Sequence, residues 1–168
     1  MTRFIITSNG QFSGPASVCR AALGKTGVKP EADKTEGDGA TPLGRYTLRR
    51  VLYRPDRGAA PETALPVRPI NPDDGWCDDP ADPAYNRPVR LPYPASCEEM
   101  TRQDGLYDII VVLSHNDDPP VAGRGSAVFL HCAKPDYPPT RGCLALARTD
   151  LVKMLAEARP GDTLEIRL

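Results

Sequence analysis

Two side chains in the C-terminal part of the chain have the types and spacing that acyl transfer requires. His131 closes the apolar run Phe129-Leu130, and Gly142-Cys143 opens a second apolar run. A thiol nucleophile needs a base to remove its proton and backbone N–H groups to stabilise the oxyanion formed on attack. The sequence therefore predicts a cysteine acyl-transfer enzyme in which Cys143 is the nucleophile and His131 the general base. Gly142 would allow close approach to an oxyanion hole that includes the Cys143 N–H group.

Activation of the thiol is the chemical problem such a site must solve. A free cysteine, with a pKa of about 8.5, is mostly protonated at neutral pH. Lowering that pKa by roughly two units requires about 2.7 kcal/mol of differential stabilisation of the thiolate. A protonated imidazole and a nearby guanidinium supply such stabilisation. We therefore expect His131 and Arg141 to lower the pKa of Cys143.

Short strands must position these groups, because 19 prolines and 14 glycines among 168 residues disfavour long helices. Alternating and continuous apolar runs predict strands at residues 3–7, 45–53, 107–113, 127–131, 142–147 and 163–168. The run 107–113 is apolar on both faces and is expected to be central, while 16–23 fits either a strand or a short helix. One helix is predicted over 149–159, with Thr149 as its N-cap. The fold class is mainly β with one short C-terminal helix.

Residues 54–105 form a long proline-rich insertion. A connection of this length is usually functional or disordered. Its aromatic residues, Trp76, Tyr85 and Tyr93, indicate an ordered segment, because disordered segments are poor in aromatics. The whole chain, 1–168, has the length of a single domain.

Composition excludes several classes of protein. The net charge of −1, with basic residues scattered along the chain, disfavours nucleic-acid binding. No apolar run is long enough to span a membrane, and residues 1–7 lack the apolar core of a signal peptide. Cys77 and Cys97 are either disulfide-bonded or both free. A zinc site using cysteines and His115 is disfavoured because no C-x-x-C pair is present.

Two motifs in the expected order resemble the L,D-transpeptidases with the YkuD catalytic domain. Thr140, Gly142 and Cys143 match that family's Ser/Thr-His-Gly-Cys motif, and His131 matches its upstream histidine. The segment Gly39-Ala40-Thr41-Pro42-Leu43-Gly44-Arg45-Tyr46 is similar to its Thr-Pro-x-Gly-Arg/Lys-Phe/Tyr segment. The resemblance covers residues 3–168 apart from the insertion, and it implies a YkuD-like β-sandwich of mixed sheets with the insertion near the cleft.

Two departures from the family pattern suggest a divergent, proteobacterial-type branch. Arg141 replaces the second histidine of the motif, and the loop between His131 and Cys143 is shorter than usual. The replaced histidine is not the family's general base, so the nucleophile and base are retained. The shorter loop is expected to reshape the wall beside the nucleophile and thus the choice of peptide.

The resemblance implies a peptidoglycan L,D-transpeptidase. Cys143 would attack the carbonyl on the L-side of an L,D peptide bond in a stem peptide, and an amine of a second stem would resolve the thioester. The product would be a 3-3 cross-link, or a 1-3 cross-link from L-Ala to diaminopimelate. The protein would then act in the periplasm or cell envelope, with peptidoglycan stem peptides as partners. The sequence leaves its oligomeric state open.

Substrate contacts are expected from the family chemistry and from residue type. Arginines such as Arg141 can bind the stem's carboxylates in a bidentate manner. Trp76 and Tyr85 are expected to line the cleft, and Thr140 and His115 complete the expected set, although the sequence favours a polar residue ending a buried strand for His115. Neither a metal nor an organic cofactor is implied.

Other functions remain open at this point. The thioester of such an enzyme can pass to water, giving an L,D-carboxypeptidase or endopeptidase. The missing motif histidine also fits a non-catalytic cell-wall-binding module on the same fold.

Overall fold

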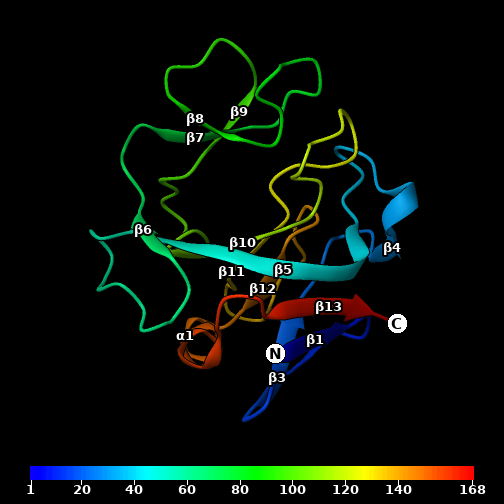
Figure 1. Ribbon diagram of the computed structural model, residues 1–168, viewed down its shortest axis with the longest axis vertical. Helices are drawn as coiled ribbons and strands as arrows, with labels where there is room; N and C mark the ends of the chain where they lie inside the picture. The colour runs from blue at the N-terminus through cyan, green and yellow to red at the C-terminus, as the bar shows by residue number, and fades with distance from the viewer.

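Strands dominate the computed structural model, which describes all of residues 1–168, and a single α-helix, α1 (Arg148–Glu157), lies near the C-terminus (Figure 1). A short 3-10 helix, η1, spans Glu31–Asp33. The strands are β1 (Arg3–Thr7), β2 (Gln11–Ser13), β3 (Val18–Ala22), β4 (Val28–Pro30), β5 (Thr41–Tyr53), β6 (Val67–Pro69), β7 (Asp74–Cys77), β8 (Pro88–Arg90), β9 (Cys97–Glu99), β10 (Ile109–Leu113), β11 (Phe129–Cys132), β12 (Leu144–Leu146) and β13 (Thr163–Arg167).

The main sheet closes on itself. Its strands follow the order β10-β11-β12-β3-β2-β1-β13-β5-β4, and β10 also pairs with β5. Closure is possible because β5 is long: Tyr46, in its first half, faces Leu164 of β13, and Leu52, in its second half, faces Ile110 of β10. The β1–β13 and β11–β12 pairs are parallel while most others are antiparallel. The predicted mainly β fold of mixed sheets with one short helix is confirmed.

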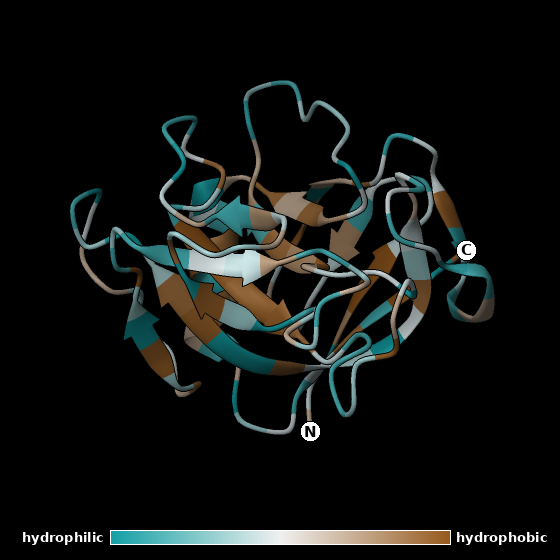
Figure 2. Cartoon of the chain, turned by 90° about the horizontal axis from the view of Figure 1, so that it is seen from above, coloured by the Kyte–Doolittle hydropathy of each residue, from teal (hydrophilic) through white to brown (hydrophobic).

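Strand β10 separates two hydrophobic cores, as its apolar sequence predicts. Ile109, Val111 and Leu113 contribute to the larger core, which also includes the buried face of α1. Ile110 and Val112 point the other way, into a smaller core. Successive side chains of a strand lie on opposite faces, so one strand serves both cores. Figure 2 shows the hydrophobic segments on the strands and the hydrophilic ones mainly in the loops.

The insertion is built from β6 and a small three-stranded sheet of order β8-β7-β9 (Figure 1, top). β6 pairs in parallel with β5, which ties the insertion to the main sheet. Ile70, Trp76 and Met100 of the insertion are buried in the smaller core. The insertion therefore covers one face of β10 and β11.

Three local predictions are refined by the structure. The ambiguous stretch 16–23 forms a strand, β3, because it pairs with β2 and β12. α1 begins one residue before Thr149, and Ala147 occupies the N-cap position without a side-chain hydrogen bond, so the N-cap prediction is wrong. α1 is too short to cross a membrane, and no other α-helix is present.

Candidate active site

The register of two neighbouring parallel strands brings Cys143 and His131 to one face of the sheet. Leu130 of β11 is paired with Leu144 of β12, and His131 with Ala145. Leu130 and Leu144 both point into the larger core. Because strand side chains alternate, His131 and Cys143, each one residue away from a core leucine, point to the opposite face. Local sequence periodicity and the pairing together therefore produce the predicted pair.

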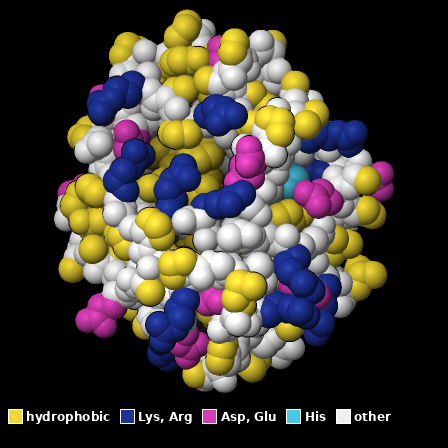
Figure 3. Space-filling model, in the orientation of Figure 1, with side chains coloured by type: hydrophobic (Ala, Val, Ile, Leu, Met, Phe, Trp, Pro, Cys, Tyr) yellow, Lys and Arg dark blue, Asp and Glu magenta, His cyan; other side chains and the backbone are white.

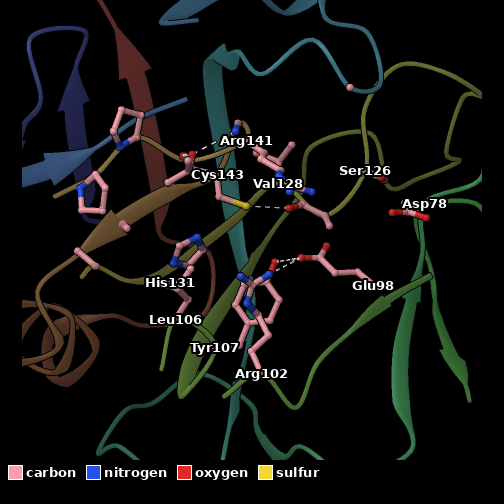
Figure 4. Close-up of a pocket in the computed structure, with 18 of the residues that line it drawn as sticks. Asp78, Glu98, Arg102, Leu106, Tyr107, Ser126, Val128, His131, Arg141 and Cys143 are labelled. Carbon is pink, nitrogen blue, oxygen red and sulfur yellow. Dashed lines mark hydrogen bonds and ion pairs between the residues drawn. The ribbon is translucent and has the colours of Figure 1, made fainter. Parts of the chain in front are cut away.

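Both side chains line a cavity of about 640 Å³. The insertion, the segment between η1 and β5, and the loops that precede β11 and β12 all border it. Figure 4 shows Cys143 and His131 beside each other on their two strands. On the molecular face drawn in Figure 3, basic side chains and an acidic one surround a hollowed hydrophobic area. This cavity is large enough to hold several residues of a peptide.

The Cys143 thiol is held in its protonated form. Its Sγ donates to the Ala127 carbonyl at 3.0 Å and accepts weakly from the Phe129 N–H at 3.5 Å. Burial, reinforced by the negative charge of Glu98, raises the pKa of Cys143 to about 12. The expectation that His131 and Arg141 lower this pKa is therefore wrong for the unliganded site, because desolvation outweighs the cationic groups nearby.

His131 is buried and neutral. Its Nδ1 lies 2.9 Å from the Cys132 carbonyl oxygen, which can only accept, so Nδ1 carries the proton and Nε2 keeps its lone pair. Burial lowers the pKa of His131 to about 4. The Tyr107 ring packs edge-on against the imidazole, with the ring centroids 5.4 Å apart. Nε2 of this tautomer has a free lone pair that can accept a proton.

Thr140 organises the turn that carries the nucleophile. Its hydroxyl donates to the Cys143 carbonyl at 2.6 Å and accepts from the Gly142 N–H at 3.1 Å. The backbone N–H of Cys143, by contrast, donates to no group of the protein. Thr140 therefore lines the cavity and stabilises the turn, while the Cys143 N–H group remains available to a ligand.

The upstream Thr-Pro segment packs directly against this turn. Buried Thr41 accepts from the Gly24 N–H at 2.9 Å and donates to the Gly142 carbonyl at 2.8 Å. Gly142 has φ +131°, and a Cβ there would come within 2.8 Å of the Ala40 carbonyl oxygen. Only glycine fits this position without strain. The two sequence motifs thus form one structural unit.

Lys34 is a cavity residue that the sequence analysis missed. Its side chain is 5 % exposed, and its ammonium lies 2.5 Å from Asp38. Despite burial, this contact and backbone N–H groups lower the pKa of Asp38. The Lys34 Nζ lies 3.5 Å from the position that a Gly142 Cβ would occupy. A positive charge therefore lies beside the nucleophile turn; no pattern in the polar stretch around Lys34 indicates it.

Glu98 is the second residue that the sequence analysis missed. It lies on β9 of the insertion and lines the cavity. Its Oε1 accepts a hydrogen bond from the Tyr107 hydroxyl and lies 3.8 Å from Arg102. Burial raises the pKa of Glu98, opposed by these two partners. The Glu98 carboxylate reaches the cavity because the insertion folds back over β10. The local sequence does not reveal this arrangement.

The expected substrate-binding residues divide into two groups. Arg141 is exposed at the cavity, and its guanidinium makes neither a hydrogen bond nor an ion pair with the protein. Trp76, Tyr85 and His115 do not line the cavity. Trp76 is instead part of the smaller core, with its ring centroid 4.9 Å from that of Phe129.

Tyr85 and His115 are buried outside the lining of the cavity, and each contacts backbone groups of the protein. The Tyr85 hydroxyl donates to Glu36 at 2.6 Å and accepts from the Gly125 N–H at 3.0 Å. The buried His115 ring contacts the Arg124 carbonyl at 3.1 Å. His115 therefore follows the structural interpretation of a polar residue after a buried strand. No cluster of three or more His, Cys, Asp or Glu side chains forms a potential metal site.

Solved structures to which this chain is similar include L,D-transpeptidases. They include an L,D-transpeptidase from Mycobacterium smegmatis (13 % identity, TM-score 0.47, 99 % of this chain and 58 % of that one). L,D-transpeptidase 3 from Mycobacterium tuberculosis, solved with a faropenem-derived adduct, is also similar (17 % identity, TM-score 0.43, 99 % and 60 %). The chain therefore spans about three fifths of the length of these relatives.

Sequence comparison is more specific. A search of curated proteins finds no match to this chain. The family model of the L,D-transpeptidase catalytic domain, YkuD, matches residues 2–166. With this match spanning nearly all of the sequence, the chain belongs to the YkuD L,D-transpeptidase catalytic domain family.

Proposed function

We propose that this chain is a cysteine L,D-transpeptidase that cross-links peptidoglycan stem peptides through a Cys143 thioester. The observation that carries the proposal is the placement of Cys143 and His131 on one sheet face, inside a cavity large enough for a peptide. Membership of the family supplies the reaction class. The cell envelope is the corresponding site of action.

Attack on the donor peptide begins from a neutral pair. His131 Nε2 takes the thiol proton as the Cys143 sulfur approaches the carbonyl carbon on the L-side of an L,D bond. The raised pKa of the thiol and the lowered pKa of the imidazole mean that no stable thiolate–imidazolium pair precedes substrate. Proton transfer and attack are therefore coupled. The imidazolium then gives its proton to the departing D-residue amine.

The oxyanion formed during attack has two suitable partners. The Cys143 N–H has no acceptor within the protein, so it can donate to the oxyanion. The Lys34 ammonium beside Gly142 adds positive charge on the same side of the turn. Losing one oxyanion donor typically costs about 2.7–4 kcal/mol in the transition state. Arg141, free of internal partners, is available to bind a carboxylate of the stem.

An amine of a second stem then resolves the thioester, giving a 3-3 cross-link or, with attack after the first L-Ala, a 1-3 cross-link. The test is incubation with tetrapeptide-stem muropeptides followed by intact-protein and product mass spectrometry. We expect an adduct on the Cys143 peptide and cross-linked dimers, both absent for Cys143→Ala. Dimers made by Cys143→Ala, or an adduct on another residue, would contradict the proposal.

The same experiment separates the alternatives. Shortened monomers without dimers would identify hydrolysis of the thioester, hence a carboxypeptidase or endopeptidase. Binding to sacculi without any adduct would identify a non-catalytic module. Cys132, a buried free cysteine on the neighbouring strand, offers a matched control: Cys132→Ala should retain the adduct.

A further inference from the structure

We propose that Glu98 binds the ammonium group of the acceptor and removes its proton for attack on the thioester. This inference rests on the proposed function and gives the insertion a role in the second half-reaction. Its ligand is a primary ammonium group, the chemistry that an anionic oxygen in a cavity recognises.

One oxygen of Glu98 is uncommitted. The Oε1 atom accepts from the Tyr107 hydroxyl, whereas Oε2 has no hydrogen-bond donor within the protein. The side chain lines the cavity and remains 26 % exposed, so Oε2 is not sealed in the interior. A carboxylate in such an environment gains most from a charged donor brought by a ligand.

The nearest cation is largely occupied elsewhere. Arg102 lies 3.8 Å from Glu98 Oε1, but it donates several hydrogen bonds to Asp104, the shortest at 2.5 Å. The Arg102 guanidinium also lies over the Tyr107 ring, 5.1 Å from its centroid. Arg102 therefore interacts mainly with Asp104. It only partly balances the negative charge of Glu98, a carboxylate that is mostly buried.

Tyr107 links this carboxylate to the catalytic pair. Its hydroxyl binds Glu98, and its ring packs against His131 with 5.4 Å between centroids. Figure 4 shows Glu98 reaching in from the insertion, with Tyr107 between it and His131. Lys34 and Arg141 also line the cavity, beside Gly142. These cations suit donor carboxylates, and the uncommitted oxygen of Glu98 suits an ammonium.

The proton balance of the second half-reaction follows from this placement. Glu98 takes one proton from the acceptor ammonium, and the amine nitrogen attacks the thioester carbonyl. His131 Nε2 takes a second proton from that nitrogen and gives it to the sulfur as the C–S bond breaks. An amide and the Cys143 thiol result, and Glu98 releases its proton to water.

Glu98→Gln tests the inference because it removes the charge and keeps a carbonyl oxygen for Tyr107. Donor acylation should be no slower than in the wild type, since the charge of Glu98 raises the pKa of Cys143. Transfer to an ammonium-bearing acceptor should fall roughly 10- to 100-fold. Transfer to hydroxylamine, which is uncharged at neutral pH, should change far less. Each step is measured by mass spectrometry of the acyl-enzyme and its products.

Glu99→Gln is the matched control. Glu99 is the next residue of β9, is exposed and does not line the cavity, so the same change of charge should leave both half-reactions unaltered. Equal slowing of the ammonium and hydroxylamine acceptors in Glu98→Gln would indicate a structural role and overturn the inference. So would unchanged transfer to the ammonium acceptor. A wild-type protein that never forms the Cys143 adduct would instead contradict the proposed function itself.

Discussion

Cys143 and His131, the proposed catalytic pair, are both neutral because both lie where charge is poorly solvated. Burial opposes the thiolate and the imidazolium alike, so the pKa of Cys143 rises and that of His131 falls. A cysteine protease with a preformed ion pair has the reverse arrangement. The consequence is low reactivity of the thiol until a substrate carbonyl is in position.

The pH dependence of acylation should show that the Cys143 thiol and the His131 imidazole are both neutral. His131 must be neutral to act as base, and its pKa of about 4 means that activity is retained down to about pH 4 and lost below it. Cys143 should be alkylated slowly by iodoacetamide at neutral pH, with a midpoint far above pH 9. Single-turnover acylation and alkylation rates across pH check this. An acid midpoint near pH 6.5 with a thiol midpoint near 7 would indicate an ion pair instead.

Thr41→Val should weaken both the fold and the site. The Thr41 hydroxyl accepts a hydrogen bond from the Gly24 N–H and donates one to the Gly142 carbonyl. Its loss leaves these two buried backbone groups unpaired. We expect a loss of roughly 1–3 kcal/mol in the free energy of unfolding, with slower acylation. Thr47→Val on the same strand is the control, because the Thr47 hydroxyl has no such partners. Denaturant titration measures the difference; equal stability of the two variants would contradict this role for Thr41.

At the scale of elements, strand register decides which groups meet. A one-residue slip of β12 against β11 would turn Cys143 into the larger core and expose Leu144. In the observed register, Leu130 and Leu144 both pack in the larger core. In the insertion, β7 and β9 likewise place Cys77 directly opposite Cys97.

Cys77 and Cys97 should form a disulfide on oxidation. The N–H and C=O of Cys77 bond to Arg87 and Asn86, which precede β8, so the pairing of Cys77 with Cys97 is a non-hydrogen-bonded one, the closer type. Both thiols are free in the structure, and burial raises the pKa of Cys97 to about 11, so reaction at neutral pH should be slow. After treatment with oxidised glutathione, peptide mapping should find this link, with a gain of about 3 kcal/mol.

Cys97→Ser should abolish the link, and Cys19→Ser should not affect it. Cys19 lies on β3 of the main sheet, away from the insertion. Persistence of two free thiols at positions 77 and 97 under these conditions would show that the strand pairing is looser than described.

At the scale of the whole molecule, the cavity exists because the smaller core attaches the insertion to the main sheet. Cys143 packs at the margin of this core, and Phe129 contributes both to the core and, through its N–H, to the environment of the thiol. Stability of the insertion and geometry of the site are therefore coupled.

Trp76→Ala should lower the stability of the protein. The indole is 4 % exposed and donates to Asn86 at 2.9 Å, so truncation should lower the free energy of unfolding by about 3–5 kcal/mol. Val121→Ala, at an exposed apolar residue, should cost little. Chemical denaturation provides the measurement. An altered donor KM at unchanged stability would instead support the original expectation that Trp76 lines the cleft.

The sequence alone determined what is local. Apolar runs at 107–113, 127–131 and 142–147 predict three buried strands, and a histidine and a Gly-Cys pair at the ends of two of them predict a nucleophile and a base. Strand period is a property of neighbouring residues, so these features can be read without long-range contacts.

Only the tertiary structure decided the electrostatics and the walls of the cavity. Lys34 and Glu98 come from segments far from the motif, and they reach it because β5 closes the sheet and the insertion folds back over β10. Trp76 lies in a core for the same reason. The pKa values of Cys143 and His131 depend on burial by all of these elements together, and burial is a sum over contacts that no short stretch of sequence contains.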